Sequence, residues 1–149
     1  MTKSLADPPA LVPELYVTDL NRSLGFYGDI LGFNVLFRRE AEGFAYLERE
    51  SAHLMLEELD SASRKFMTAE MSPPFGRGVN LQIRVADIDE LYQRVISAGF
   101  EFVVDLEDRW YLQLEFEPGN RQFVVADPDG YLLRFYSDLG TRASNAVTE

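Results

Sequence analysis

Two stretches of the chain place apolar residues at the three- and four-residue spacing of a helix with one buried face. These residues are Leu20, Leu24, Tyr27 and Leu31 in the first stretch, and Ile88, Leu91, Tyr92 and Val95 in the second. Asp19 and Asp87 precede the stretches, where a carboxylate can accept the free N–H groups of a first turn. Gly32 and Gly99 follow them, where glycine suits the left-handed end of a helix. The pattern predicts two capped helices.

Short alternating segments follow each helix and predict β-strands. They are 33–37, 44–48 and 52–56 after the first helix, and 101–106, 122–125 and 131–136 after the second. A further strand precedes each helix. Asp127-Pro128-Asp129-Gly130 predicts a tight turn, and Pro118-Gly119-Asn120 predicts another after an extended or lid-like segment over 110–116. The order is therefore βαβββ, twice, which indicates an internal repeat and an α+β fold.

We expect one domain over 11–137, made of modules 11–59 and 79–137 with a linker over 60–78, an N-terminal extension over 1–10 and a polar tail over 138–149. The linker contains Pro73-Pro74 and is long for a simple connection. It is either a flap over a pocket or an arm that packs on a partner.

Alternation gives each outer strand of a module one apolar face, for the helix, and one mixed polar and aromatic face. Tyr16 and Tyr136 lie on the mixed face, and large aromatic side chains are unfavourable when they are fully exposed to water. We interpret this face as a sheltered ligand surface; a solvated face and a dimer contact are the alternatives. The candidate ligand-binding residues are Tyr16, Met55, Asn80, Gln82, Arg84, Trp110, Arg134 and Tyr136.

The composition of the chain limits the classes of partner and of metal site that it can have. The chain has 149 residues, no cysteine, one histidine and a net charge of −11, which excludes disulfides and thiolate metal sites. The basic surface of a nucleic-acid binder is missing. No apolar run is long enough for a membrane span or a secretory signal, so we expect a cytoplasmic protein. An acidic protein attracts cationic ligands at long range.

Taken together, Val17-Thr18-Asp19-Leu20, Leu31-Gly32-Phe33 and Asp127-Pro128-Asp129-Gly130-Tyr131 resemble motifs of the vicinal oxygen chelate superfamily. That superfamily includes glyoxalase I, extradiol dioxygenases and bleomycin resistance proteins. The resemblance implies two βαβββ modules forming a curved mixed sheet around a cavity, usually in a homodimer. It also implies four metal-ligand positions, which fall here on Val12, Met55, Asn80 and Arg134. None is His or Glu, so we expect no metal and no other cofactor.

The segment Gly119–Val125, running into Asp127-Pro128-Asp129-Gly130, resembles the bleomycin-resistance branch. Membership would imply antibiotic resistance through sequestration of a bulky cationic drug, with Trp110 stacking on flat rings. We therefore expect a metal-free ligand-binding protein with no catalytic residue.

Three alternatives remain open. In the first, the chain is an enzyme of the superfamily, an isomerase, lyase or dioxygenase-like protein with an atypical or absent metal site, in which Glu14, Glu57 or His53 is the acid–base group. In the second, Arg84 and Arg134 hold a carboxylate or phosphate of an anionic ligand, unless they pair with Glu14 and Glu57. In the third, the module is a small dimer whose vestigial cavity is filled by its own side chains.

Overall fold

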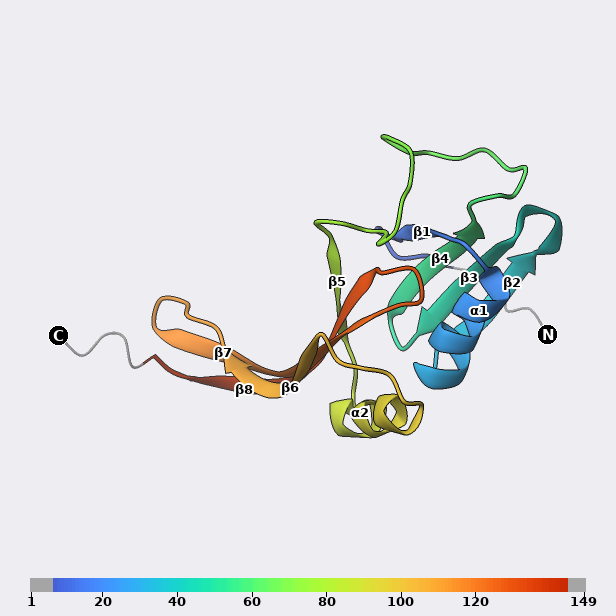
Figure 1. The fold of residues 1–149 in the computed structure, drawn as a ribbon. Coiled ribbons are helices and arrows are strands. Elements are labelled where there is room, and N and C mark those ends of the chain that lie inside the picture. Colours follow the sequence, from blue (N-terminus) through green and yellow to red (C-terminus); the bar gives the residue numbers. More distant parts are fainter. Residues whose placement is uncertain (1–6, 145–149) are drawn as a thin grey trace. The chain divides into compact units, whose positions relative to one another are not determined.

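The computed structural model describes residues 7–144. The chain divides into two compact units (Figure 1). Unit 1 contains the chain up to Arg77 together with the segment Asp127–Tyr131, and unit 2 contains Gly78–Ala126 and the chain from Leu132 onward. No helix within residues 7–144 has the length and hydropathy needed to cross a bilayer.

Unit 1 carries a four-stranded sheet in the order β1-β4-β3-β2. β1 and β4 are parallel, and the other neighbours are antiparallel. Its elements are β1 (Glu14–Val17), α1 (Leu20–Leu24), a π-helical continuation η1 (Gly25–Ile30), β2 (Asn34–Arg39), a short 3-10 turn η2 (Glu40–Glu42), β3 (Phe44–Arg49) and β4 (Ala52–Glu58).

Unit 2 repeats this plan with the order β5-β8-β7-β6 and one parallel pair, β5 with β8. Its elements are β5 (Asn80–Arg84), α2 (Ile88–Ser97), β6 (Val104–Trp110), β7 (Phe116–Ala126) and β8 (Leu132–Ala143). The predicted α+β class and the βαβββ order of both modules are confirmed.

The helix caps lie where the sequence predicts them. The Asp19 carboxylate accepts the N–H of Arg22 at 3.1 Å, and the Asp87 carboxylate accepts the N–H of Glu90 at 3.0 Å. Gly32 and Gly99 adopt φ of 82° and 79°, the left-handed conformation that ends a helix. The first helix differs from the prediction after Leu24, because it widens into π-helical turns.

Each helix packs on the apolar face of the sheet in its own unit. Leu31, Leu54 and Leu56 are fully buried in unit 1. Leu91, Val95, Leu133 and Phe135 are fully buried in unit 2, where the rings of Phe123 and Phe135 lie 5.7 Å apart. The mixed faces described below are therefore the faces that the helices leave uncovered.

Pro118-Gly119-Asn120 is not a turn, so this prediction is wrong. The three residues lie inside β7, where Gly119 pairs with Trp110 of β6 and with Gly140 of β8. The Trp110 ring comes within 2.6 Å of the position that a Cβ of residue 119 would occupy. Residue 119 is a glycine because the Trp110 ring lies against the strand and leaves no room for a side chain. The turn prediction fails because strand pairing on both sides outweighs the local preference of Pro-Gly-Asn for a turn.

The expected tail also differs from the structure. β8 continues to Ala143 and pairs with β7 as far as Phe116, so residues 138–143 belong to a strand. Residues 1–6 and 145–149, which complete the expected extension and tail, lie outside the described residues.

The segment Asp127–Tyr131, which we call the acidic turn, joins β7 to β8 but packs within unit 1. Asp127 Oδ1 accepts the N–H groups of Asp129, Gly130 and Tyr131, each at 2.9 Å. Its Oδ2 accepts the Tyr27 hydroxyl at 2.8 Å. The turn predicted here is confirmed, and its carboxylate is bonded on both oxygens.

Asp129 anchors the acidic turn to the start of the first helix. Its carboxylate accepts the Thr18 N–H at 3.1 Å and the Thr18 hydroxyl at 2.6 Å, and it pairs with Arg22 at 3.1 Å. The Tyr131 hydroxyl donates to the carbonyl of Tyr16 in β1 at 2.8 Å. Burial raises the pKa of Tyr131 to about 12, with Asp127 and Asp129 adding to the effect. The phenol therefore stays protonated and remains a donor.

We expect the Asp127→Ala substitution to lower the free energy of unfolding by about 3 kcal/mol or more, because it leaves three backbone N–H groups and one phenol without their acceptor. Urea denaturation followed by circular dichroism measures this loss. Tyr27→Phe is the matched control: it removes one of the four bonds and should cost about 1 kcal/mol. Equal stability of Asp127→Ala and the wild type would contradict this account of the turn.

Candidate functional site

The uncovered face of the unit 1 sheet gathers aromatic side chains from three strands. In the register, Glu14 of β1 lies beside Met55 of β4, which lies beside Tyr46 of β3. Phe37 of β2 pairs with Tyr46, and their rings stack 5.2 Å apart at 14°. Tyr16 is two residues along β1 from Glu14 and shares its face. We call Tyr16, Phe37, Phe44, Tyr46 and Met55 the aromatic face; it brings two predicted site residues, Tyr16 and Met55, together.

Much of the aromatic face is closed by its own rings. Phe44 and Tyr46 are only 2% and 4% exposed, while Phe37 and Met55 are partly exposed. The Tyr46 hydroxyl is hydrogen-bonded to His53 Nδ1 at 2.8 Å. Phe37, Phe44 and Tyr46 were missed as candidates. The signal for them was present, because alternation in β3 places Phe44 and Tyr46 on one face.

Part of the linker covers Tyr16 and Glu57. The Phe66 N–H donates to the Tyr16 hydroxyl at 2.7 Å, and the Ser63 hydroxyl donates to Glu57 Oε1 at 2.6 Å. The Lys65 ammonium donates to the hydroxyls of Ser61 and Ser63, each at 2.7 Å, and lies 3.9 Å from Glu57. We call residues 61–66 the flap. Glu57 beneath the flap is 4% exposed.

The flap also changes the chemistry of Tyr16. Burial raises the pKa of this phenol, the hydrogen bond from the Phe66 N–H lowers it, and the nearby Glu14 carboxylate raises it. Burial prevails, so Tyr16 is a neutral phenol at physiological pH. It offers a ligand a ring and a hydroxyl rather than a charge.

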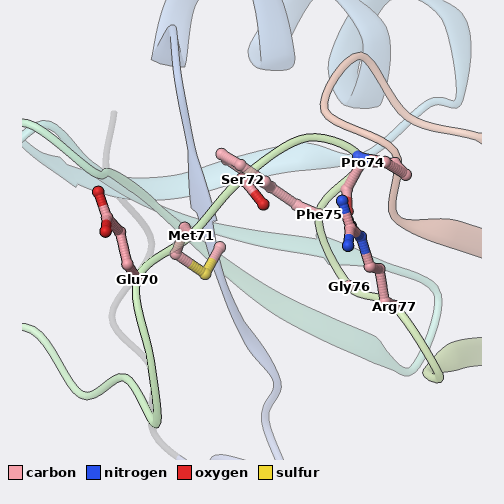
Figure 2. Close-up of a pocket in the computed structure, with 7 residues that line it drawn as sticks. All are labelled: Glu70, Met71, Ser72, Pro74, Phe75, Gly76 and Arg77. Atoms are coloured by element: carbon pink, nitrogen blue, oxygen red, sulfur yellow. Dashed lines mark hydrogen bonds between the residues drawn. The ribbon is translucent and has the colours of Figure 1, made fainter.

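The rest of the linker forms an open pocket of about 180 Å³ (Figure 2). Its lining residues are Glu70, Met71, Ser72, Pro74, Phe75, Gly76 and Arg77. The Arg77 guanidinium donates to the carbonyls of Pro73 and Pro74 at 2.7 and 3.2 Å, so it holds the segment rather than facing a ligand. None of the eight predicted site residues lines this pocket.

The uncovered face of the unit 2 sheet is polar. Gln82 of β5 pairs with Arg134 of β8, and Arg84 pairs with Tyr136. Asn80 lies two residues before Gln82 and shares this face. Arg134 donates to Gln82 Oε1 at 2.5 Å. We call Asn80, Gln82, Arg84, Arg134 and Tyr136 the arginine face; it contains five of the eight predicted residues.

A chain of hydrogen-bonded polar side chains, which the sequence analysis missed, lies next to the arginine face. Gln122 of β7 pairs with Tyr136 and is only 5% exposed. Its Oε1 accepts the Tyr111 hydroxyl at 2.7 Å, and its Nε2 donates to Glu107 at 3.0 Å. Both ends of the amide are bonded, which fixes its orientation. The available signal was a glutamine directly before the apolar run Phe123–Ala126.

Trp110, the eighth predicted residue, makes its contacts away from the other predicted residues. Its ring lies over Gly119, and the Arg142 guanidinium lies 4.3 Å from the ring centre. Neighbouring residues of a strand face opposite ways, and Tyr111 is the one that reaches Gln122. The structure therefore does not bring Trp110 together with the arginine face.

The four positions that would hold a metal in this superfamily do not fit one. Val12 and Met55 in unit 1 and Asn80 and Arg134 in unit 2 supply no carboxylate and no imidazole, and a guanidinium repels a cation. Between residues 7 and 144 no group of three or more His, Asp or Glu side chains is arranged to hold an ion.

Comparison with known proteins gives consistent results. The family model of the Glyoxalase/Bleomycin resistance protein/Dioxygenase superfamily matches residues 10–135. A bleomycin resistance protein of Geobacillus stearothermophilus is 31% identical over 135 residues, covering 86% of this chain and 96% of the relative. An uncharacterized protein of Mycobacterium tuberculosis is 29% identical over 138 residues, covering 87% and 75%.

Solved structures share the fold. TioX from Micromonospora sp. ML1 superposes with a TM-score of 0.69 at 25% identity, covering 87% of this chain and 98% of that one. A glyoxalase/bleomycin resistance protein/dioxygenase from Alicyclobacillus acidocaldarius gives a TM-score of 0.61 at 21% identity, covering 93% and 96%. The second of these comparisons bears on the fold alone.

We expect Tyr16→Phe to accelerate amide hydrogen exchange of the flap about five-fold, because the Phe66 N–H loses an acceptor worth about 1 kcal/mol. Exchange followed by mass spectrometry on peptides spanning 61–66 measures the change. Tyr136→Phe, which removes a hydroxyl in unit 2, should leave these peptides unchanged. The hydrogen bond would not hold the flap if Tyr16→Phe and wild type exchanged at the same rate.

Proposed function

Because this chain belongs to the Glyoxalase/Bleomycin resistance protein/Dioxygenase superfamily, we propose that it binds and sequesters a partly aromatic small molecule without a metal ion, in the manner of a bleomycin resistance protein. The observation that carries the proposal is the 31% identity to bleomycin resistance proteins over nearly their whole length. Antibiotic resistance is the physiological role that this proposal implies.

The aromatic face supports a binding role. The half-buried Phe37 ring is stacked on Tyr46 and held in place by it, so it offers a ligand ring a rigid surface. A stacked aromatic pair contributes about 0.5–1.5 kcal/mol beyond its buried area. The Glu14 carboxylate lies on the same side of β1 as Tyr16 and would attract a positively charged group. The net charge of −11 acts in the same direction at long range.

Two of the three acid–base candidates are engaged by neighbours. His53 is bonded to Tyr46, and Glu57 accepts from Ser63 beneath the flap. The third candidate, Glu14, is exposed and lies near the Tyr16 phenol. A side chain held in an internal bond has to break it before it can accept a substrate proton. This arrangement supports binding over the alternative of turnover.

We further propose a cytoplasmic homodimer. Leu112, Leu114 and Phe116 are exposed apolar residues at alternate positions leading into β7, and Leu114 is 91% exposed. Groups of exposed apolar residues mark contacts with another protein. A second copy of the chain is the partner that the family resemblance supports.

Sedimentation equilibrium should give the mass of a dimer, and Leu114→Glu should move it toward the monomer, because a charge buried in an apolar contact opposes association. Leu11→Glu, which places the same charge on an exposed apolar residue of unit 1, should leave the mass unchanged. A monomeric wild type would refute the dimer.

We expect bleomycin to raise the melting temperature of the purified protein in a saturable way, since a ligand that binds only the folded state stabilises it by about 2.7 kcal/mol at one hundred times its Kd. Phe37→Ala should weaken binding about ten-fold, the equivalent of about 1.4 kcal/mol of lost ring contact, measured by isothermal titration calorimetry. Phe100→Ala, which truncates a partly exposed ring of unit 2, is the control and should bind as the wild type does.

The same melting assay tests the metal-free claim. Protein treated with a chelator is mixed with Mn²⁺, Ni²⁺, Zn²⁺ or Fe²⁺, and no saturable shift is expected. A clear shift with one of these ions would contradict the claim and favour the enzyme alternative. Absence of any shift with bleomycin would remove that drug as a ligand.

A further inference from the structure

Arg84 and Arg134 lie on the same side of the unit 2 sheet, on neighbouring strands. Gln82 pairs with Arg134 and Arg84 pairs with Tyr136, so the two arginines are diagonal neighbours. Neighbouring strands are about 4.8 Å apart and alternate residues about 6.6 Å apart, which puts the two Cα atoms about 8 Å from each other. Two arginine side chains at this separation can converge on one small group.

Both guanidinium groups keep donors without an acceptor. Arg134 donates to Gln82 at 2.5 Å, but its Nε is buried and has no partner among residues 7–144. Arg84 is exposed, and within the same part of the chain it makes no ion pair. A buried donor left unsatisfied destabilises the folded protein, and more so when it is charged. An external acceptor would remove this cost.

Two carboxylates on strands close to this face, Glu107 and Asp138, have hydrogen-bond partners within unit 2. Glu107 accepts from Gln122 at 3.0 Å, and Asp138 accepts the N–H of Gly140 at 2.7 Å. Two like charges side by side on one face of a sheet destabilise it. Neither carboxylate forms an ion pair with Arg84 or Arg134 within residues 7–144, so in unit 2 the two guanidinium groups keep donors for an external acceptor.

The arginine face is also accessible. Asn80, Gln82 and Arg84 are exposed, whereas Ile83 and Val85, which alternate with them, are buried. Tyr136 lies beside Arg84 and adds the edge or face of a ring. The aromatic face of unit 1, by contrast, is largely closed by its own side chains.

We propose that the arginine face is a binding site for an aromatic carboxylate, with Arg84 and Arg134 holding the carboxylate and Tyr136 contacting the ring. The planar guanidinium fork matches the two oxygens of a carboxylate, and the amides of Asn80 and Gln82 offer neutral donors at its edge. The inference rests on the proposed function as a small-molecule binder and deepens it by naming, for the unit 2 surface, a ligand that carries a carboxylate.

An NMR titration of the full ¹⁵N-labelled protein with benzoate tests the site. Benzoate should shift amide signals of β5 and β8. Arg84→Gln and Arg134→Gln should each weaken benzoate about ten-fold or more, because a hydrogen bond to a charged group contributes about 1.5–3 kcal/mol. Arg134→Lys keeps the charge but loses the fork, so it should weaken benzoate as well. Circular dichroism checks that each variant is folded, and the exposed Arg84 provides a test should Arg134→Gln unfold.

Two comparisons make the titration specific. Benzamide has the shape of benzoate without its charge, and we expect it to bind about ten-fold more weakly. Arg94→Gln removes the same charge from α2. That helix covers the other side of this sheet, as the contact of Arg121 with Asp89 indicates, so benzoate affinity should not change.

Four outcomes would overturn the inference. Two concern affinity: benzamide binds as tightly as benzoate, or both Gln variants bind benzoate as the wild type does. The third is that benzoate shifts amide signals of unit 1 only. The fourth is that inorganic phosphate binds more tightly than benzoate, which would indicate a phosphate site. Bleomycin binding without benzoate binding would refute this inference and leave the proposed function standing. Failure of both ligands would count against both.

Discussion

The buried carboxylate of Asp127 is the interaction on which the rest of the structure depends. Burial raises the pKa of Asp127 and of its partner Tyr27, so both groups need their hydrogen bonds. Asp127 bonds three N–H groups of its own turn and one phenol of the first helix. A residue between the last two strands of the second module is thereby fixed in the core of the first.

This anchor extends to the candidate site through Tyr16. The Tyr131 hydroxyl bonds the backbone carbonyl of Tyr16, while the Tyr16 hydroxyl bonds the flap at Phe66. One residue of β1 is therefore held by the acidic turn through its backbone and by the flap through its side chain.

The two modules share a topology and differ in chemistry. Both place a parallel pair of strands next to an antiparallel pair, yet unit 1 presents rings and carboxylates where unit 2 presents arginines and amides. The fold determines the positions of the side chains, and the identity of those side chains determines which ligands can bind. The four positions that the family resemblance marks for metal ligands hold Val12, Met55, Asn80 and Arg134, none of which supplies a carboxylate or an imidazole.

The sequence by itself determined the features that depend on local chemistry. Apolar spacing located both helices, Asp19 and Asp87 capped them, and the Asp127 turn and the repeated βαβββ order could be read directly. Only the tertiary structure decided that Gly119 lies within a strand, because strand pairing on both sides outweighs a local turn preference. It also decided that Trp110 packs under Arg142 and that the flap covers Tyr16. These contacts join residues far apart along the chain, and no local pattern encodes which of them come together.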